Sequence, residues 1–518
     1  MAVWSEGYFT DVEYVNYYFR ELSPLYLNLN LTLAGYDIPC RGEEDICPPE
    51  SFNYLELAFG QGASINVHAA TTSGNYVGTD FNPMQVAIAR DYAVGDNIIL
   101  YDDSFRELLE RFEKEQPQFD YIVLHGIFSW ISQENRNVIL EIIRKFLKVG
   151  GVVYNSYNCM PGWSAKTPSR ELLSLYKELY GSAEMDTQAF VKSSLGFIEE
   201  FLKINPSYAI NVPQNRQFLE DVKNENFAYI SHEYFNQNWD CFYFYQVAKM
   251  IEEAKCSFAT SADCLGQFDR FNIMSNASEF FNKIQNKIFK EQLKDYYLNC
   301  QFRRDIYVKG ARAITYKQAM DRLMNTHFIL TNSFKNLKDK VQCAVEEINL
   351  NREIYQPVLN VLEKDDFQPK TMRKITQECK LKFGQVLEFL MLGVHQNIIS
   401  PTQPLTPDIE KRVKVYNANL LKRLVRYGQS SYLASPVTAS ALMISSIEQL
   451  AISAYIKETK KETELVNFIV KLFKENKREI IKEGKILESE AENKAVIKEV
   501  VKEFLEKVPL YKALGILE

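Results

Sequence analysis

Residues 54–62 read Tyr-Leu-Glu-Leu-Ala-Phe-Gly-Gln-Gly, an apolar run that carries an acid at Glu56 and leads into a turn of small residues. About twenty residues later, residues 76–80 read Tyr-Val-Gly-Thr-Asp, a second apolar run that ends in the acid Asp80. This order predicts a strand, a glycine-rich turn, a helix and a second strand with a carboxylate at its tip. Glycines let the backbone approach a ligand closely, and the carboxylate can bind both hydroxyls of a ribose. The stretch therefore predicts a nucleotide-binding unit.

Strand and helix patterns continue to alternate after this unit. We expect strands at 53–58, 75–79, 97–101, 119–125 and 151–157. We expect helices near 62–72, 83–92, 104–115 and 133–148. Pro83 suits the first turn of its helix, and Gly150-Gly151 suits a left-handed cap at the end of the last one. The alternation predicts an α/β fold with a parallel sheet, helices on both faces and ligands at the carboxyl ends of the strands.

The composition excludes several classes of protein. The chain has 518 residues, of which 46% are hydrophobic and 13% aromatic, enough for two to four globular domains. A net charge of −7 predicts no nucleic-acid partner, and no apolar run reaches the length that stable membrane insertion requires. The N-terminus does not resemble a secretory signal, so we expect a cytoplasmic protein. Nine cysteines without a Cys-x-x-Cys pair and five dispersed histidines predict neither a disulfide framework nor a metal site.

The pattern along the chain divides it into five expected units. Residues 1–50 form a helical cap, whose tyrosines either only pack or also cover a ligand pocket. Residues 51–165 form the α/β core, and residues 166–345 form a helical regulatory or substrate domain. Residues 346–404 read as a small winged-helix-like domain and residues 405–518 as a C-terminal helical domain.

The glycine turn favours S-adenosylmethionine over a dinucleotide as cofactor. It lacks the third glycine of a dinucleotide fingerprint, and the acid Glu56 precedes it. Asp80 is expected to bind the ribose hydroxyls, and Asp102 or Asp103 to accept from the adenine amino group. Glu56 would order the turn and reach the methionine amine through water. Ser104 or Asp103 has an alternative role as the N-cap of the following helix. The expected cofactor-binding residues are Glu56, Ala58, Gly60, Gly62, Asp80, Phe81, Asp102, Asp103, Ser104 and His125.

Residues 54–83 resemble the first two motifs of the class I S-adenosylmethionine-dependent methyltransferases. Residues 119–130 and 151–163 resemble the fourth- and fifth-strand signatures of one subfamily, which carries a methyltransferase regulatory domain. Residues 232–236 and 302–304 resemble that regulatory domain. The subfamily includes rickettsial protein lysine methyltransferases that modify outer membrane protein B. The resemblance implies a Rossmann-like core followed by largely helical C-terminal domains. Ala58 departs from the pattern, since many class I enzymes have a glycine there, but cofactor binding is expected to survive.

The resemblance implies methyl transfer to lysine amines of a protein substrate, such as a bacterial surface protein. Five candidate catalytic residues fall at or just beyond the ends of the fourth and fifth strands, namely His125, Ser129, Trp130, Tyr157 and Asn158. Trp130 would form a wall for the alkyl stem, Tyr157 and Asn158 would orient the amine, and His125 would accept a proton. Each residue also has a structural interpretation, as a lid, a core residue or a turn residue. Trp163 and His232 are expected to pack rather than to contact the substrate.

Two other functions stay open at this stage. The first keeps the cofactor but transfers the methyl group to a small molecule or a cell-envelope precursor. The second is a cofactor-binding scaffold with little turnover, whose helical C-terminal half binds partners. The sequence also leaves a homodimer open, and the state of methylation of the product.

Overall fold

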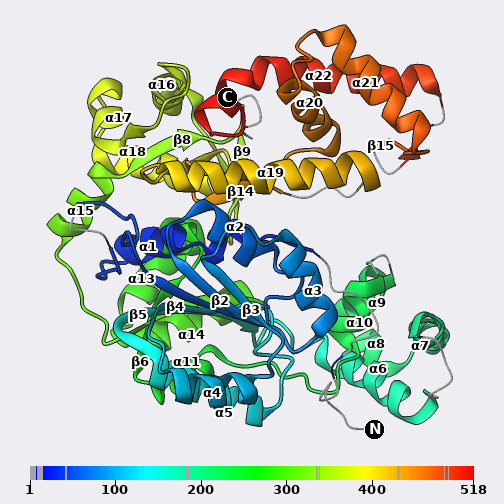
Figure 1. Ribbon diagram of the computed structural model, residues 1–518. Helices are drawn as coiled ribbons and strands as arrows, with labels where there is room; N and C mark the ends of the chain where they lie inside the picture. The colour runs from blue at the N-terminus through cyan, green and yellow to red at the C-terminus, as the bar shows by residue number, and fades with distance from the viewer. Residues whose placement is uncertain are drawn as a thin grey trace.

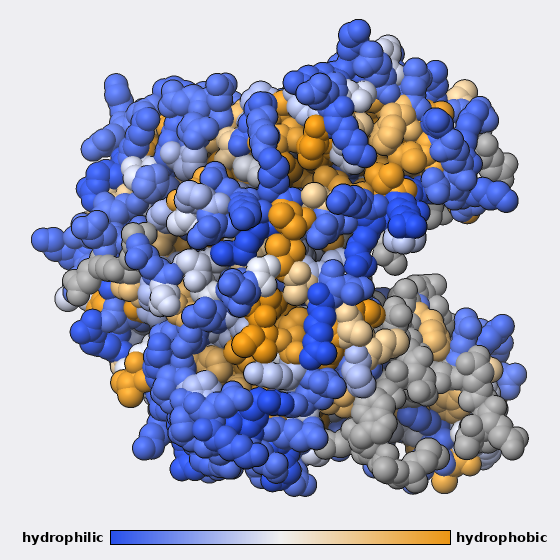
Figure 2. Space-filling view, in the orientation of Figure 1, coloured by the Kyte–Doolittle hydropathy of each residue, from blue (hydrophilic) through white to orange (hydrophobic). Residues whose placement is uncertain are grey.

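The computed structural model describes Tyr8 and residues 16–40, 44–181, 187–223, 225, 227–333, 337, 339–428, 432–482, 485–487 and 489–518. Figure 1 shows a twisted sheet with helices on both sides, a lobe of helices beside one end of the sheet, and a second helical part above it. In Figure 2 hydrophilic residues cover most of the visible surface, and hydrophobic ones show mainly in a band down the middle of this face and in its upper part. Among the described residues, no helix combines the length and apolar character that crossing a membrane requires.

The central sheet has seven strands in the order β3-β2-β1-β4-β5-β7-β6. Its strands are β1 (Asn53–Leu57), β2 (Asn75–Thr79), β3 (Ile98–Tyr101), β4 (Phe119–Leu124), β5 (Leu147–Asn158), β6 (Cys256–Ser261) and β7 (Phe302–Lys309). The first five run parallel, and β7 runs antiparallel to both β5 and β6. From β1 the chain moves outward to β2 and β3, and from β4 it moves the opposite way to β5. The winding therefore reverses between β1 and β4, where open α/β sheets bind ligands.

Apolar residues bury both faces of this sheet. Tyr54 and Leu55 are neighbours in β1 and belong to different apolar clusters, because successive side chains of a strand point to opposite faces. One face packs against α2 (Ala63–Thr71) and α3 (Pro83–Tyr92), and the other against α4 (Phe105–Glu115) and α5 (Gln133–Phe146). This arrangement confirms the expected Rossmann-like α/β core.

The element boundaries follow local chemistry closely, with one correction. Asn82 caps α3 by accepting from the Met84 N–H at 3.0 Å, and Pro83 follows it in the first turn. Ser104 caps α4 in a capping box with Glu107. The helix expected at 133–148 ends at Phe146, and Gly150 is not its cap. Strand β5 begins directly at Leu147, and Gly150 takes a φ of 84° within that strand.

The region expected as a helical unit at 166–345 also completes the sheet. It supplies β6 and β7, because residues 302–308 pair with the end of β5 from Val152 to Asn158. The helices of its first half form the lobe beside the sheet in Figure 1. They are α6 (Thr167–Tyr180), α7 (Thr187–Lys203), α8 (Ser207–Asn211), α9 (Pro213–Lys223) and α10 (Phe227–Tyr234). The rest comprises α11 (Phe244–Glu252), η2 (Cys264–Gln267), α12 (Asp269–Asn272), α13 (Ser275–Asn282), α14 (Lys287–Leu298), α15 (Tyr316–Asn325), β8 (His327–Leu330) and β9 (Lys340–Gln342).

The C-terminal part contains short strands as well as helices. Residues 346–404 supply β10 (Glu347–Asn349), α16 (Arg352–Glu363), β11 (Lys370–Thr371), α17 (Met372–Cys379), α18 (Phe383–His395) and β12 (Ile399–Pro401). β8, from outside this range, lies between β11 and β12 in a three-stranded sheet. Residues 405–518 supply α19 (Pro407–Tyr427), β13 (Leu433–Ser435), β14 (Ser440–Leu442), α20 (Ser446–Ile456), α21 (Glu462–Glu475), β15 (Ile481–Lys482), β16 (Lys485–Ile486) and α22 (Glu490–Ala513). The largely helical C-terminal region predicted from the sequence is confirmed.

The described part of the N-terminal region packs deep inside the molecule. It contains η1 (Arg20–Leu22) and α1 (Pro24–Leu33), and nearly every residue of α1 is buried. The Asn28 side chain donates to the carbonyls of Pro39 and Ile46 and accepts from the Tyr121 hydroxyl. Residues 16–19 are not helical, and residues 1–7, 9–15 and 41–43 of the expected helical cap lie outside the described residues. One apolar cluster joins α1, the sheet and the C-terminal helices, so this segment connects the two main parts.

Candidate active site

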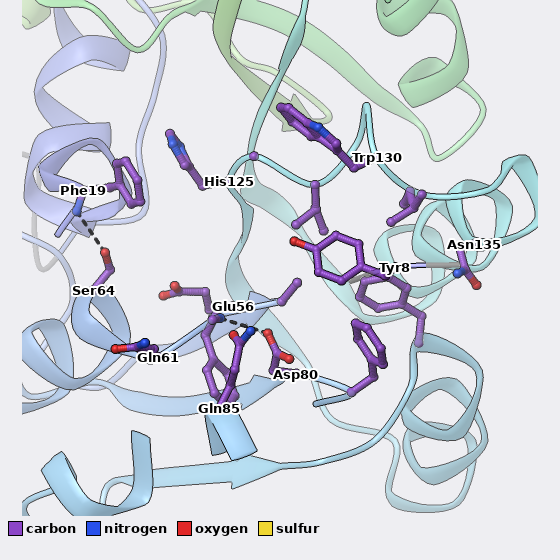
Figure 3. A pocket seen from close by; sticks show the side chains of 18 of the residues that line it. Tyr8, Phe19, Glu56, Gln61, Ser64, Asp80, Gln85, His125, Trp130 and Asn135 are labelled. Atoms are coloured by element: carbon purple, nitrogen blue, oxygen red, sulfur yellow. Dashed lines mark hydrogen bonds between the residues drawn. The ribbon is translucent and has the colours of Figure 1, made fainter. Parts of the chain in front are cut away.

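A cavity opens at the carboxyl ends of β1 and β4, where the winding of the sheet reverses. Together with its open mouth it holds about 1220 Å³ of space. Nine of the residues predicted from the sequence line it, namely Glu56, Ala58, Gly60, Asp80, Phe81, Asp103, Ser104, His125 and Trp130. Figure 3 shows Glu56 and Asp80 at one side of the cavity and His125 and Trp130 at the other. Gly62, Asp102, Ser129, Tyr157 and Asn158 do not line it.

The glycine turn keeps the backbone close to the cavity. Ala58, Gly60 and Gly62 all adopt a positive φ, of 56°, 59° and 76°. A side chain costs about 1 kcal/mol in this region, so Ala58 holds a conformation that a glycine would adopt more easily. Gly62 has a second constraint, because a Cβ there would lie 2.5 Å from the Cβ of Ala89. The turn therefore needs its glycines for shape, even where, as at Gly62, they do not line the cavity.

The Asp80 carboxylate connects the end of β2 to this turn. One oxygen accepts from the Gly60 N–H at 2.9 Å and the other from the Asn82 N–H at 3.0 Å. Asp80 is only 5% exposed, and burial raises its pKa to about 7 against the effect of these two hydrogen bonds. Each carboxylate oxygen retains lone pairs, so Asp80 can still accept from ligand hydroxyls.

Glu56 is the second buried acid beside the turn. Its carboxyl accepts from the Tyr54 hydroxyl at 3.3 Å, and burial raises its pKa to about 8. No Lys or Arg pairs with Glu56 or Asp80 among the described residues, although buried carboxylates are normally paired. The two acids thus form a site that favours a ligand with hydroxyl and cationic groups.

The two acids that follow β3, Asp102 and Asp103, lie in different environments. Asp102 lies outside the cavity, with its half-exposed side chain 3.8 Å from Arg90. Asp103 lines the cavity, but its carboxylate is engaged by Arg111, with N–O distances of 2.7 and 3.1 Å. Ser104 takes the capping role that the sequence left open. Of this group, Asp103 and Ser104 line the cavity and Asp102 does not, and contact of either lining residue with adenine stays a prediction.

His125 and Trp130 line the part of the cavity beyond β4. His125 stacks on Phe19, with ring centroids 3.8 Å apart, and its Nδ1 lies 2.8 Å from the Tyr154 hydroxyl. Burial, and then the charge of Arg304, lower the pKa of His125 to about 3. The ring is therefore neutral at physiological pH and a poor proton acceptor. The indole Nε1 of Trp130 is buried without a hydrogen-bond partner in the described structure.

The other three candidate catalytic residues support the cavity wall from behind. The Ser129 hydroxyl accepts from the Asn158 N–H at 2.8 Å. The Asn158 side chain donates to Glu233 of α10 at 3.3 Å. The Tyr157 hydroxyl donates to Asp305 of β7 at 2.6 Å, inside the core. Trp163 packs in the apolar cluster of the helical lobe.

Several lining residues were not among the sequence-based candidates for the cofactor or catalytic site. Tyr8, Asn16, Tyr17 and Phe19 come from the N-terminal region, Gln85 comes from α3 and Asn238 from the segment after α10. Tyr8 and Tyr17 agree with the suggestion that N-terminal tyrosines cover a ligand pocket. The Tyr8 ring lies 5.8 Å from Phe81 and 5.4 Å from His232, which places His232 behind the cavity.

Three potential metal ligands that are distant in sequence meet at the end of β5. The ligand atoms of Cys159, Asp295 and Cys300 all lie within 4.8 Å of one another. Cys159 Sγ lies 3.5 Å from one carboxylate oxygen of Asp295. The other oxygen of Asp295 accepts from the Arg303 guanidinium at 2.6 Å. Hydrogen bonding with Cys300 and then burial raise the pKa of Cys159, which favours the thiol over the thiolate. Hydrogen bonds explain this cluster, and the prediction of no metal site stays a prediction.

The residues of the cavity fit S-adenosylmethionine. The described lining residues include three acids, Glu56, Asp80 and Asp103, and no Lys or Arg. Two of these acids are free to accept from hydroxyl or ammonium groups, and the turn brings backbone close to them. An acidic, partly aromatic cavity suits a cationic cofactor with a ribose.

Comparisons with known proteins agree with this geometry. A family model described as a methyltransferase domain matches residues 55–153, and a model described as a predicted methyltransferase regulatory domain matches residues 226–309. The chain is 34% identical to the uncharacterized protein sll1526 of Synechocystis over 99% of both chains. It is 28% identical to the uncharacterized protein RP028 of Rickettsia prowazekii, over 48% of this chain and 93% of that one.

The fold as a whole is shared with a solved structure. PKMT2 from Rickettsia typhi, in complex with AdoHcy, superposes with a TM-score of 0.67 at 19% identity. The match covers 97% of this chain and all of that one. The fold, the site and these matches together show that the chain belongs to the class I S-adenosylmethionine-dependent methyltransferases that carry a methyltransferase regulatory domain.

Proposed function

We propose that this protein methylates lysine side-chain amines of a protein substrate, such as a bacterial surface protein. One observation carries the proposal: the described cavity lining has three acids, aromatic rings and no Lys or Arg. A lining without Lys or Arg disfavours carboxylate or phosphate acceptors, and its aromatic rings suit a cationic acceptor. A lysine ammonium has the charge and the slender alkyl stem that this cavity suits. The resemblance to the rickettsial protein lysine methyltransferases and the fold shared with PKMT2 of Rickettsia typhi support the same choice.

The chain's residues would prepare the acceptor rather than activate the donor. S-adenosylmethionine, when bound, would supply an electrophilic methyl group on a sulfonium, and the neutral thioether that departs would need no acid. Asp80 would bind the ribose hydroxyls, and Glu56 and the turn would hold the methionine end. Trp130 would flank the alkyl stem and attract the cationic group by cation–π interaction. The protein must also lower the barrier to removing one proton, since a free lysine is almost entirely protonated at neutral pH.

A labelling experiment tests the proposal. The enzyme is incubated with radiolabelled S-adenosylmethionine and, separately, with whole-cell lysate and with purified surface proteins as methyl acceptors. We expect label in discrete protein bands. Label confined to small molecules or lipid would support a methyltransferase of a small molecule or envelope precursor instead. If no label is transferred although calorimetry shows tight cofactor binding, a cofactor-binding scaffold replaces the proposal.

A further inference from the structure

Gln85, in the first turn of α3, is a polar side chain that lines the cavity although it is only 4% exposed. The Oε1 atom of its amide is buried and has no hydrogen-bond partner among the described residues. A buried amide without partners destabilises the free protein, because folding removes the water that would otherwise solvate it. At the wall of a ligand cavity, such an amide points to a ligand that supplies the missing hydrogen bond.

The packing of α3 fixes the place of the Gln85 amide. Ala89 follows Gln85 by about one helical turn, so both residues lie on the same face of α3. That face meets the glycine turn, because a Cβ at Gly62 would lie 2.5 Å from the Cβ of Ala89. The start of α3 is tied to Asp80, whose carboxylate accepts from the N–H of the cap residue Asn82. Gln85 is therefore held near both the glycine turn and Asp80, and Figure 3 shows Gln85 and Asp80 on the same side of the cavity.

Hydrogen-bond donors are scarce on this side of the cavity. The described lining has no Lys or Arg, and the N–H of Gly60 already donates to Asp80. A ribose hydroxyl that donates to the Asp80 carboxylate keeps lone pairs on its oxygen, and these lone pairs need a donor. A half-turn about the last side-chain torsion exchanges Oε1 and Nε2, so the Gln85 amide can present an N–H to the cavity. The amide of Gln85 and the carboxylate of Asp80 are thus complementary partners for the same hydroxyl.

We propose that Gln85 donates an amide N–H to a ribose hydroxyl of the cofactor whose proton Asp80 accepts. Gln85 is then a specificity-determining residue for the methyl donor, since it recognises the hydroxyl oxygen while Asp80 recognises the hydroxyl hydrogen. The inference concerns the donor alone and holds for any methyl acceptor, whether a protein or a small molecule. Its failure would therefore leave the proposed function untouched.

Isothermal titration calorimetry of the full-length protein with S-adenosylhomocysteine tests the inference. Gln85→Met keeps the length of the side chain but removes its donor, so we expect affinity to fall about 3- to 10-fold. Gln85→Glu should lower affinity further, because a second carboxylate near Asp80 cannot donate when ionised and repels its charge. Gln292→Met is the matched control, since Gln292 of α14 is a buried glutamine with one unpartnered amide atom that does not line the cavity. The control should bind like the wild type, and wild-type affinity in Gln85→Met would overturn the inference.

Analogues of the cofactor locate the contact. Methylthioadenosine keeps the ribose but lacks the carboxylate and amine of the methionine end, so Gln85→Met should weaken its binding by the same factor. Two deoxy forms of S-adenosylhomocysteine each lack one ribose hydroxyl, and for one of them Gln85→Met should cause no further loss of affinity. A loss for S-adenosylhomocysteine without a loss for methylthioadenosine would overturn the inference, because the amide would then contact the methionine end. An undiminished loss for both deoxy forms would also overturn it.

The stability of the ligand-free protein separates this role from a structural one. Because Gln85→Met removes an unpartnered buried amide, the melting temperature without ligand should stay the same or rise. Saturation with S-adenosylhomocysteine should then raise the melting temperature less in Gln85→Met than in the wild type, since binding is weaker. A ligand-free variant that is clearly less stable than the wild type would overturn the inference, because the amide would then serve the fold.

Discussion

Asp80 and Asp102 offer a sharp test of the cofactor site, because the sequence nominates both and the structure separates them. Asp80 is buried at the cavity, where it accepts from two backbone N–H groups. Asp102 is half-exposed, lies near Arg90 and does not line the cavity. We therefore predict that Asp80→Ala weakens cofactor binding by at least two orders of magnitude, whereas Asp102→Ala leaves it nearly unchanged.

The magnitude follows from the hydrogen bonds that Asp80 would make. A hydrogen bond to a charged group contributes about 1.5–3 kcal/mol, so two ribose hydroxyls correspond to about 3–6 kcal/mol. The predicted loss of affinity is therefore about 150-fold to about 2 × 10⁴-fold. Asp102→Ala removes a surface charge whose contribution is below about 1 kcal/mol.

Isothermal titration calorimetry with S-adenosylmethionine is the assay, with thermal unfolding as the check on folding. Wild-type affinity should fall as pH drops through about 7, because protonation removes the charge that strengthens the hydrogen bonds to the hydroxyls. Any dependence that remains in Asp80→Ala should centre near pH 8, where Glu56 titrates. Near-normal binding by a folded Asp80→Ala protein would refute the assignment of the ribose carboxylate. An equal loss in Asp102→Ala would refute the placement of the cavity.

Three further variants separate chemistry from architecture. Trp130→Ala should keep cofactor affinity but lower turnover about 10- to 100-fold, because the variant loses the wall that positions the amine. Unchanged turnover would show that Trp130 has only a structural role. Tyr157→Phe should destabilise the protein by about 1–3 kcal/mol, because Asp305 loses a buried donor. The Tyr157→Phe variant should still turn over substrate. A variant that is folded but inactive would instead show that Tyr157 takes part in catalysis. Gly62→Ala should lower the melting temperature, at a cost of about 1–3 kcal/mol, because the turn has a φ of 76° and no room for a Cβ beside Ala89. A Gly62→Ala variant that is as stable as the wild type would contradict the described turn.

The fold of the α/β core was predictable because the sequence signals for its strand ends and helix caps lie next to the elements that they mark. Each strand end carries its own acid or turn residue, and caps such as Asn82 and Ser104 act within three residues of their positions. The helix end near Gly150 was misplaced because a glycine with positive φ serves a strand irregularity as well as a helix cap. The sequence could not place β7 in the sheet, because its partner β5 lies more than a hundred residues away, and only the pairing shows that residues 302–309 complete the sheet.

The site was predictable only where its residues follow a strand of the core. Glu56, Asp80 and Trp130 fall at strand ends, and strand ends meet at one edge of a parallel sheet. Tyr157 does not line the cavity, because alternation along β5 turns it toward Asp305, and its catalytic role stays a prediction. Asn238 follows a helix of a distant lobe, and nothing in its own neighbourhood of the sequence points to the cavity.

The central claim is that lysine amines are the acceptors, and blocking those amines tests it most directly. Purified surface proteins would be divided into two portions, one untreated and one with its lysines chemically acetylated. Both would be incubated with the enzyme and radiolabelled S-adenosylmethionine, and labelled peptides would be mapped by mass spectrometry. We predict label on lysines of the untreated proteins and none on the acetylated ones. Equal label in both portions, or label mapped to other residue types, would contradict the account.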